Sequence, residues 1–556
     1  MCGILIVINK NKKKLKIRKN ILNHRGPDFS KYLHRNGVNF RHWRLSIIDL
    51  TKNSNQPMED KNNILLYNGE IYDYKNLSKN ILKEKSKSDT IFLFKLLKKK
   101  KFHLINNFSG FYAYAYLNKI ENKLYFGRDI IGKKPLYYFN DENYFILSSE
   151  EKGIHKFLNK KEINNNAISE YFFFKSISYG KTFYRNIYLI PPGSNFNFSI
   201  NDWKIYTDKN WEQYYQQPLF VNKKNNFIEK FPALIKQSVK KRNNCDVKTQ
   251  LALSSGQDSN LILNEIVNNK NIKNFEQSIG VGFDEKNNEN YFSKIICKEN
   301  KTKFVDLRFE EKNTLTLIKK CIRSNDGPLD HPNYIAFDIL CKKASNYGKV
   351  LLTGEGADDL FFGYNHYKKN SYTQSFAFRI FYDKKILNII LKKKNNNFEF
   401  KKILNNINFY FIKKKIQKSI FYSRELEFKT HLQSLLKRND RISMKNSIEV
   451  RCPFLDINII KKIPSNLKII KKKLFINLLP KMYLKNIKKK KIGFYAPINK
   501  YLLNKSQKEI NFFIERAVKF LEKKNNILID INLKKSAKVR WILLNIGIFI
   551  HQNEKQ

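Results

Sequence analysis

Short apolar runs, separated by Gly, Asn and Asp, make up most of the chain between Ile4 and Phe198. The clearest of them lie at 4–8, 64–67, 111–117, 123–126 and 144–148. Their length and residue types are those of β-strands, whereas residues 89–97 repeat apolar positions with the period of a helix. The pattern predicts a sheet-rich domain that starts at the first residues of the chain.

A polar stretch rich in Trp, Gln and Asn follows and predicts a linker over residues 206–228. Beyond it, strand-like runs alternate with helical segments at 250–253, 259–268, 277–281, 289–299, 303–307 and 349–352. Such alternation predicts a parallel sheet with helices on both faces. From residue 367 onward the pattern is mainly helical. We therefore expect an α/β chain, with one domain over 2–205 and a doubly wound domain with a helical C-terminal part over 229–556.

The charge balance is strongly positive, with 106 Lys+Arg against 49 Asp+Glu and a formal net charge of +57. Such a charge favours nucleic acid or an anionic membrane as a partner. The cations are mostly Lys, however, and the chain is also rich in Asn and Ile, a joint enrichment that an A/T-rich genome produces. Hydrophobic content of 42% and aromatic content of 14% exclude a disordered chain. We expect a globular protein that binds neither nucleic acid nor membrane.

The six cysteines are scattered without a CxxC or CxxH pair, so neither a zinc ribbon nor a disulfide framework is indicated. The apolar run at 4–8 is too short for the core of a signal peptide, and no stretch reaches the roughly 20 apolar residues that span a bilayer. These features predict a soluble protein of a reducing, cytoplasmic compartment.

Cys2 stands between the initiator Met and Gly3. Because cysteine is small, the initiator can be removed, which leaves cysteine at the amino terminus. A terminal amino group has a pKa of about 7.7–8.0, so it can take the thiol proton of its own side chain and act as general base. Taken alone, Cys2 would be interpreted as a buried apolar cysteine beside a strand. The motifs that follow it change that interpretation.

Those motifs are His24-Arg25-Gly26-Pro27-Asp28, Arg44-Leu45-Ser46-Ile47-Ile48-Asp49, Gln56-Pro57-Met58, Tyr67-Asn68-Gly69-Glu70-Ile71-Tyr72, Ser88-Asp89-Thr90, Arg128-Asp129 and Gly132-Lys133-Lys134-Pro135-Leu136-Tyr137-Tyr138. In this order after Cys2, they resemble the glutaminase domain of class II glutamine amidotransferases, which are N-terminal-nucleophile hydrolases. The asparagine synthetase branch is the nearest match. The resemblance covers residues 2–200, implies an α+β sandwich, and makes Cys2 the nucleophile that forms a thioester with glutamine and releases ammonia.

The same resemblance assigns roles around the nucleophile. The Asn68 side-chain amide and the Gly69 backbone N–H would form the oxyanion hole. Arg44 would hold the α-carboxylate of glutamine through a bidentate fork, and Asp89 would pair with its α-ammonium group, with Glu70 nearby. Taken singly, Arg44 or Asp89 would be a surface ion-pair residue, and Asn68-Gly69 an ordinary turn. Their joint spacing favours the functional interpretation.

A second constellation begins with Leu253-Ser254-Ser255-Gly256-Gln257-Asp258-Ser259-Asn260, between a predicted strand and a predicted helix. Backbone N–H groups at such a turn favour phosphate. The motif resembles the pyrophosphate loop of ATP pyrophosphatases, SGGxDS. Ser255 replaces the first loop glycine and Gln257 the usual apolar residue. Taken alone, the motif is equally well explained as a polar helix cap.

The segment Leu352-Thr353-Gly354-Glu355-Gly356-Ala357-Asp358-Asp359-Leu360-Phe361-Phe362-Gly363-Tyr364 resembles the asparagine synthetase signature SGEGxDExFGGY. Asp359 stands where the family has Glu, and Phe362 where it has Gly. Asp258 and Asp358 would lie at the carboxyl ends of two strands, where their carboxylates can hold Mg²⁺ across the phosphates of ATP. The residues expected to bind ATP are Leu253, Ser254, Ser255, Gly256, Gln257, Asp258, Ser259, Ile279, Gly280, Thr353 and Gly354.

Two further segments extend the resemblance over about residues 230–500. Residues 440–456 resemble DRxSMxxSxEVRxPFLD, which shapes the nucleotide and intermediate site in the family. Lys491-Ile492-Gly493-Phe494, with Pro497 after it, resembles KxGFxxP. By position, Lys491 would neutralise charge that develops on the pyrophosphate, and Glu355 would be the general base toward the attacking amine. Taken alone, Lys491 belongs to a lysine run and would be solvated.

The two halves together imply that aspartate, glutamine and ATP give asparagine, glutamate, AMP and pyrophosphate through an acyl-adenylate. The alternative is an amidotransferase that acts on another carboxylate, such as an acidic sugar, because no aspartate-binding residue can be assigned. A β-lactam synthetase relative is disfavoured by the intact glutaminase motifs. A non-enzymatic polyanion-binding protein is disfavoured because both sites have their chemical groups. A homodimer is implied by the resemblance alone.

Overall fold

The structure is a computed structural model of the chain. It describes residues 2–158, 160–177, 180–217, 219–220, 226–282, 289–309, 313–364, 420–464, 471–486, 499–503, 508–529 and 536–554.

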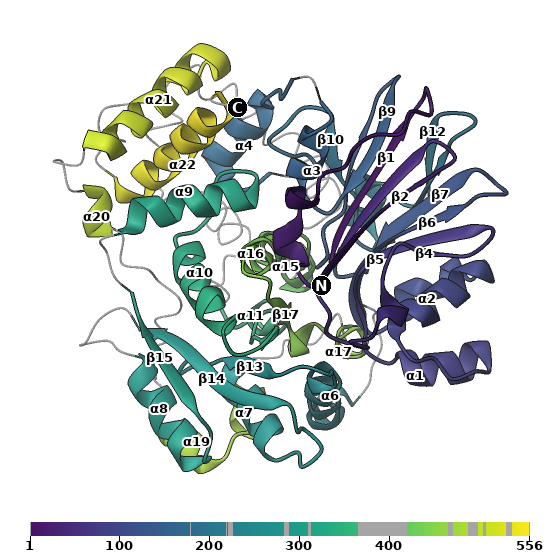
Figure 1. The fold of residues 1–556 in the computed structure, drawn as a ribbon. Coiled ribbons are helices and arrows are strands. Elements are labelled where there is room, and N and C mark those ends of the chain that lie inside the picture. Colours follow the sequence, from purple (N-terminus) through teal and green to yellow (C-terminus); the bar gives the residue numbers. More distant parts are fainter. Residues whose placement is uncertain are drawn as a thin grey trace.

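Two antiparallel sheets stack on each other in the first part of the chain, on the right of Figure 1. One has the strand order β10-β8-β9-β1-β3-β2 and the other the order β12-β11-β7-β6-β5-β4. Their strands are β1 (Gly3–Asn9), β2 (Phe29–Arg35), β3 (Val38–Arg44), β4 (Met58–Glu59), β5 (Asn63–Ile71), β6 (Gly110–Asn118), β7 (Lys123–Arg128), β8 (Tyr137–Asn140), β9 (Tyr144–Ser148), β10 (Ile187–Leu189), β11 (Asn195–Ser199) and β12 (Lys204–Thr207).

Side-chain alternation along β1 explains why the sheets stack. Ile4, Ile6 and Ile8 lie in the buried cluster between the two sheets, together with Leu66 of β5. Leu5 lies on the opposite face of the same strand, in a cluster that continues into the second part of the chain. Because both faces are covered, β1 is buried along its whole length.

Short helices flank this sandwich: α1 (Tyr74–Leu77), α2 (Asp89–Lys98), α3 (Glu151–His155) and α4 (Asn165–Phe174). At the start of α2 the Ser88 side chain accepts a hydrogen bond from the Ile91 N–H over 3.2 Å, which caps the helix. Phe92 and Leu96 then pack in one cluster with Tyr112 of β6. The helix predicted at 89–97 is confirmed, and its first turn holds Asp89.

The stretch predicted as a linker carries secondary structure of its own. β12 pairs with β11, and α5 (Trp211–Gln216) follows it. The Trp211 indole N–H donates to the Leu189 carbonyl over 2.9 Å, so α5 is fastened to the sandwich. The second part then begins with α6 (Phe227–Asn243).

The second part contains a five-stranded sheet with the order β15-β14-β13-β16-β17, and every strand pair in it is parallel. Its strands are β13 (Thr249–Ala252), β14 (Phe275–Gly282), β15 (Phe304–Arg308), β16 (Val350–Leu352) and β17 (Glu449–Arg451). The helices between them, on both faces of the sheet in Figure 1, are α7 (Gln257–Val267), α8 (Glu289–Glu299), α9 (Thr314–Asn325), α10 (Asn333–Ala344) and α11 (Ala357–Leu360). The strand order reverses between β13 and β16, which is where open α/β sheets bind ligands.

The remaining described helices belong to the C-terminal part: α15 (Ile420–Lys429), α16 (His431–Lys445), α17 (Ile457–Ile460), α18 (Lys471–Ile476), α19 (Lys481–Asn486), α20 (Asn499–Leu503), α21 (Lys508–Asn525) and α22 (Ala537–Glu554). A Cβ built on Gly547 of α22 would lie 1.8 Å from the Phe513 carbonyl oxygen of α21, so glycine allows these two helices to pack closely. Within the part of the chain that the structure describes, no helix combines the length and apolar character needed to cross a membrane.

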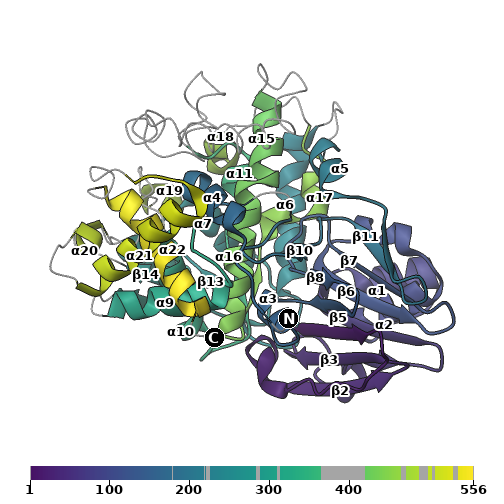
Figure 2. The same ribbon diagram turned by 90° about the horizontal axis from the view of Figure 1, so that it is seen from above.

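Helix α16 lies between the sandwich and the parallel sheet in both views (Figures 1 and 2). One buried apolar cluster runs from Leu5 of β1 through Leu251 of β13 to Leu544 of α22, so the two parts share a core. The expected fold class, an α+β sandwich followed by a parallel α/β sheet with a helical C-terminal part, is confirmed.

Candidate active sites

The first candidate site surrounds Cys2, just before β1. The backbone nitrogen of Cys2 donates to Asn68 Oδ1 of β5 over 2.9 Å. Asn68 is fully buried, and its Nδ2 has no hydrogen-bond partner among the described residues. A buried amide donor without a partner is costly unless a ligand supplies the acceptor. The pair therefore has the chemistry of a nucleophile beside an oxyanion donor.

Gly69 follows Asn68 and has a φ of +151°, a conformation that favours glycine. A Cβ at this position would lie 2.2 Å from the Phe111 carbonyl oxygen and 2.4 Å from Tyr112 Cα. Any side chain would therefore force β5 and β6 apart next to Asn68, the hydrogen-bond partner of Cys2.

The Cys2 thiol is itself buried, and burial raises its pKa, although its contact with the Leu45 backbone and the charge of Arg44 act in the opposite direction. The thiol is consequently held in its neutral form. A general base is needed for attack, which fits the expectation that the free amino terminus takes the proton.

Arg44, at the end of β3, has partners within its own domain. Its Nη1 donates to the Thr51 carbonyl over 2.7 Å and to Asn55 Oδ1 over 2.8 Å, and its Nη2 donates to the Asp49 carbonyl. The guanidinium thus fixes the loop that follows β3. Sequence reasoning gave Arg44 a ligand-binding role only, and the structure adds this loop-supporting one.

Asp89 is buried in the first turn of α2 and contacts β5. Its Oδ2 accepts hydrogen bonds from the Tyr67 hydroxyl over 3.0 Å and from the Ile71 N–H over 3.1 Å, and its Oδ1 accepts one from the Thr90 N–H over 2.8 Å. Burial raises the pKa of Asp89 to about 6, and these hydrogen bonds oppose the rise only in part. The carboxylate is therefore ionised at neutral pH and becomes neutral in mild acid.

This titration predicts a pH dependence of glutamine binding. If ionised Asp89 holds the α-ammonium group, binding weakens as the pH falls through about 6, by about fivefold between pH 6 and pH 5. Calorimetric titration of glutamine into the Cys2→Ala protein measures this without turnover. In the same protein, Asp89→Asn should bind weakly at every pH, and a constant affinity down to pH 5 with Asp89 present would contradict the assignment.

Glu70, two residues beyond Asn68 on β5, faces the second part of the chain. Its carboxylate forms an ion pair with Arg451 of β17, whose Nε also donates to Glu449 Oε1 over 2.8 Å. Burial, together with nearby Glu449, raises the pKa of Glu70, while Arg451 holds the pKa of Glu449 low. The structure therefore places the Glu70 side chain at the contact between the two parts.

The second candidate site lies where the parallel sheet reverses its strand order. The loop after β13 is folded by its own hydroxyl groups, since Ser254 N–H donates to Ser259 Oγ over 3.1 Å and Gly256 N–H donates to Ser254 Oγ over 3.2 Å. Asn260 Nδ2 donates to the Gly256 carbonyl over 2.7 Å. Helix α7 starts at Gln257, so the loop leads directly into a helix N-terminus, a favourable place for phosphate.

Ser255 and Gln257, the two residues that differ from the family loop, are both accommodated in this turn. Ser255 is buried, and its Oγ has no hydrogen-bond partner among the described residues, which leaves one hydroxyl available at the loop. Gln257 is half-buried in the first turn of α7. Gly280 of β14 approaches closely, because a Cβ there would lie 3.0 Å from the Leu253 carbonyl oxygen, and Ile279 accepts the Leu253 N–H hydrogen bond over 2.9 Å.

The loop after β16 meets the loop after β13, because β13 and β16 are neighbouring parallel strands. A Cβ on Gly354 would lie 2.8 Å from Asp258 Cβ, so the absence of a side chain lets the two loops touch. Asp358 follows in α11 and is half-buried. The carboxylates of Asp258 and Asp358 thus follow adjacent strand ends, and carboxylate oxygens are the ligands that Mg²⁺ prefers.

Two further groups complete this region. Thr353 N–H donates to the Arg451 carbonyl over 2.9 Å, which ties the β16 loop to β17. Glu355 forms an ion pair with Arg438 of α16, a residue that sequence reasoning missed. Arg438 stands two positions before the Asp440-Arg441 motif, and that position alone could have drawn attention to it. Lys491, the expected charge-neutralising residue, lies outside the described residues.

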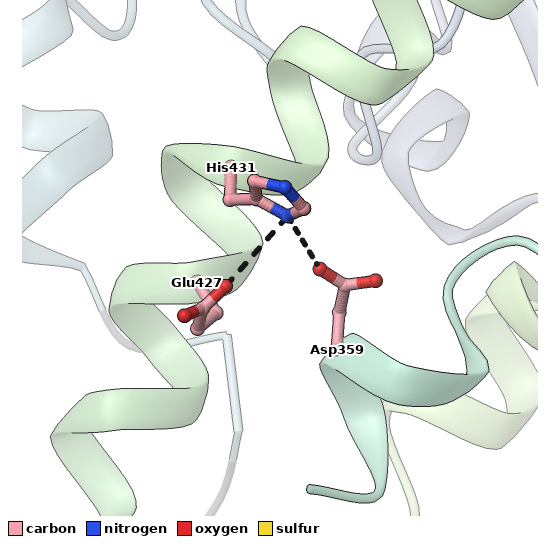
Figure 3. Close-up of side chains that lie close together, drawn as sticks. All are labelled: Asp359, Glu427 and His431. Atoms are coloured by element: carbon pink, nitrogen blue, oxygen red, sulfur yellow. Dashed lines mark hydrogen bonds and ion pairs between the residues drawn. The ribbon is translucent and has the colours of Figure 1, made fainter. Parts of the chain in front are cut away.

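Asp359 of α11 belongs to a different cluster, which it forms with Glu427 of α15 and His431 of α16. The ring nitrogen Nδ1 of His431 lies 3.3 Å from Asp359 Oδ1 and 3.7 Å from Glu427 Oε2 (Figure 3). The Tyr364 hydroxyl donates to Asp359 Oδ2 over 3.1 Å. Aspartate in place of the family glutamate therefore still has partners. The three groups have the chemistry to ligate a divalent cation.

Phe362 adopts a φ of +54°, in the left-handed region that favours the glycine of the family pattern. The Arg424 guanidinium lies over its ring at 4.7 Å from the centroid. The chain keeps the turn that the glycine would make and adds a cation–π contact to it.

Comparison with known proteins gives the family. Residues 1–212 match the model of the glutamine amidotransferase domain, and residues 230–511 match that of asparagine synthase. A relative from Methanocaldococcus jannaschii, described as a glutamine-hydrolysing asparagine synthetase, is 31% identical over 455 residues, which cover 76% of this chain and 86% of the relative. Asparagine synthetase [glutamine-hydrolyzing] 1 of Bacillus subtilis is 26% identical over 596 residues, which cover 93% and 90%.

Among solved structures, glutamine phosphoribosylpyrophosphate amidotransferase from B. subtilis superposes with a TM-score of 0.27 at 11% identity, over 45% of this chain and 60% of that one, a likeness too low to inform the site. The family-model match covers the whole parallel sheet, including both strand-end loops. With a glutamine amidotransferase domain before it, the chain belongs to the asparagine synthase family.

Proposed function

We propose that this protein is a glutamine-hydrolysing asparagine synthetase, which converts aspartate, glutamine, ATP and water into asparagine, glutamate, AMP and pyrophosphate. The names of the relatives support aspartate as the acceptor. The observation that carries the proposal is that one chain holds the Cys2–Asn68 pair and two neighbouring strand-end loops, with a shared buried core between them.

In the glutaminase half, the amino terminus takes the thiol proton and Cys2 Sγ attacks the glutamine carboxamide. Asn68 Nδ2 and the Gly69 N–H donate to the oxygen that becomes negative in the tetrahedral intermediate. Collapse of that intermediate gives a thioester and releases ammonia, and water then frees glutamate. Arg44 and Asp89 hold the two charged groups of the substrate, so only the side-chain amide lies next to sulfur.

In the synthetase half, the loop from Ser254 to Ser259 binds the phosphates of ATP at the N-terminus of α7. The carboxylates of Asp258 and Asp358 would hold Mg²⁺, which offsets phosphate charge when bound. The acceptor carboxylate attacks the α-phosphorus, and pyrophosphate leaves. Glu355, oriented by Arg438, accepts a proton from the ammonia that attacks the acyl carbon of the adenylate. Lys491 is proposed to stabilise the leaving pyrophosphate.

We also infer that the enzyme acts in the cytoplasm and as a homodimer. All six cysteines are buried and unbridged, which fits a reducing compartment. The dimer follows the family resemblance and is tested by light scattering of the purified protein.

An acceptor screen tests the substrate. The purified protein should form AMP with glutamine and aspartate, and AMP formation with glucuronate or galacturonate should stay at the level seen without an acceptor. The Cys2→Ala protein supplied with ammonium chloride is the matched control, since it tests the synthetase half alone. If an acidic sugar supports AMP formation and aspartate does not, the acceptor is that sugar and not aspartate. The proposed adenylate chemistry would then be unchanged.

A further inference from the structure

Helix α16 carries functional side chains on two sides. Arg438 pairs with Glu355 beside the synthetase cleft, whereas Asp440 pairs with Arg25 of the glutaminase domain. Residues two apart on a helix point about 200° away from each other, because each residue turns the helix by about 100°. One rigid element therefore contacts both candidate sites.

The contact on the glutaminase side reaches the nucleophile itself. Arg25 Nε donates to the Cys2 carbonyl oxygen over 3.1 Å. The other end of the guanidinium forms a fork with Asp440, with Nη1 to Oδ2 at 2.8 Å and Nη2 to Oδ1 at 3.1 Å. Arg25 and Asp440 are both completely buried. A bidentate fork fixes the plane of the guanidinium, and therefore the position of its Nε–H.

Neighbouring charges hold α16 and the sandwich in one arrangement. Glu150 accepts from Arg25 Nη1 over 2.7 Å and lies 3.2 Å from Arg441 Nη1. Arg441 also pairs with Glu151 and lies 3.2 Å from Asp326. Every one of these side chains is buried, so the loss of one partner would leave a buried charge without full compensation. A shift of α16 must therefore move Arg25 as well.

We propose that Asp440 is a positioning residue for Cys2, and that α16 couples the state of the synthetase cleft to the geometry of the glutaminase nucleophile. The inference rests on the proposed function of Cys2. Asp440 fixes the orientation of the Arg25 guanidinium, and the guanidinium in turn fixes the position of the Cys2 main chain through its carbonyl oxygen. A ligand that changes the Glu355–Arg438 pair acts on the same helix two residues away.

The test compares Asp440→Asn with the wild-type protein. The amide keeps the shape and removes the charge, so the fork loosens and the kcat of glutamine hydrolysis should fall by about 10- to 100-fold, as expected for misplacement of a reacting group. The KM for glutamine should stay unchanged, because Arg44 and Asp89 are untouched. Ammonia-dependent AMP formation should fall far less than glutamine hydrolysis, because Asp440 pairs with Arg25 of the glutaminase domain whereas the neighbouring Arg438 pairs with Glu355.

A second readout follows the coupling directly. In the wild-type protein, ATP with aspartate should change the rate at which iodoacetamide alkylates Cys2 by about fivefold or more, and in Asp440→Asn this response should disappear. Asp73→Asn is the matched control, because Asp73 forms another ion pair between the two parts, with Lys241 at 2.5 Å, without contact to Arg25 or Cys2. That variant should keep both the rate and the response.

Asp440→Glu covers the case in which the amide variant does not fold. It keeps the negative charge beside Arg25 but lengthens the side chain, so kcat should fall at constant KM. Wild-type kcat and alkylation response in either variant would overturn the inference, and so would equal losses of both activities. If the wild-type protein hydrolyses no glutamine, or if Cys2→Ala still does, the proposed function fails instead.

Discussion

Cys2→Ala is expected to abolish glutamine-dependent asparagine formation, by about 10⁴-fold or more, and to leave ammonia-dependent formation intact. Removing the sulfur removes the nucleophile and with it the thioester, whereas the backbone N–H of residue 2 that donates to Asn68 Oδ1 is kept. The small, buried side chain can be replaced by a methyl group with little change in packing. The measurement is AMP and asparagine formed with glutamine and, separately, with ammonium chloride.

The control for this variant is Cys297→Ala, which removes an equally buried thiol from α8, within the parallel-sheet domain. It should retain both activities. Glutamine hydrolysis that survives in Cys2→Ala would show that another group is the nucleophile, and loss of the ammonia-dependent reaction would show that Cys2 is needed for the fold.

Strand and helix positions were predictable where local pattern and burial agree. The apolar run at 4–8 forms β1, and the alternation after residue 250 forms the parallel sheet, because strands buried on both faces are mostly apolar. The end of β12 and all of α5 lie in the polar stretch 206–228, which the pattern alone describes as a linker. β12 is mostly exposed and α5 mixes polar with aromatic residues, so neither shows the apolar alternation from which buried elements are predicted.

The residues of the candidate sites also differ in how far the local sequence predicts them. Motifs that are contiguous in sequence, such as Asn68-Gly69 and Ser254 to Ser259, were found as units. The pairing of Arg25 with Asp440 joins residues 415 positions apart, and no spacing rule predicts it. Local motifs therefore predict which groups do the chemistry, whereas the three-dimensional fold is needed to see how the two chemistries meet.

The positive charge of the chain also has a clearer meaning. The arginines within motifs are buried and make several hydrogen bonds each, as Arg25 does to Asp440 and Arg128 does to the carbonyl oxygens of Lys134 and Ile190. A planar guanidinium can satisfy several buried acceptors, and an ammonium group cannot reproduce that fork. Arginine is thus kept where geometry demands it, which fits the view that the lysine excess reflects codon usage and surface.

Asp258→Asn should produce the opposite pattern to Cys2→Ala. Asp258 lies at the start of α7 and against Gly354, where the loops after β13 and β16 touch. Replacing its carboxylate by an amide removes one negative charge from the position where phosphates and Mg²⁺ are proposed to bind. AMP formation with either nitrogen source should fall by about 10²- to 10³-fold, whereas glutamine hydrolysis at Cys2 should persist.

The matched control is Glu276→Gln, which makes the same change of charge on the same sheet. Glu276 lies at the opposite end of β14 from Gly280 and forms a surface ion pair with Lys248 at 2.9 Å. Measuring AMP formation over a range of Mg²⁺ concentrations separates the two explanations of a loss. If Asp258→Asn needs a higher Mg²⁺ concentration than the wild-type protein, the Asp258 carboxylate binds the metal. If the Mg²⁺ requirement is unchanged while the activity is lower, Asp258 acts only by maintaining the shape of the loop. Full activity in Asp258→Asn would exclude this strand end as the nucleotide site.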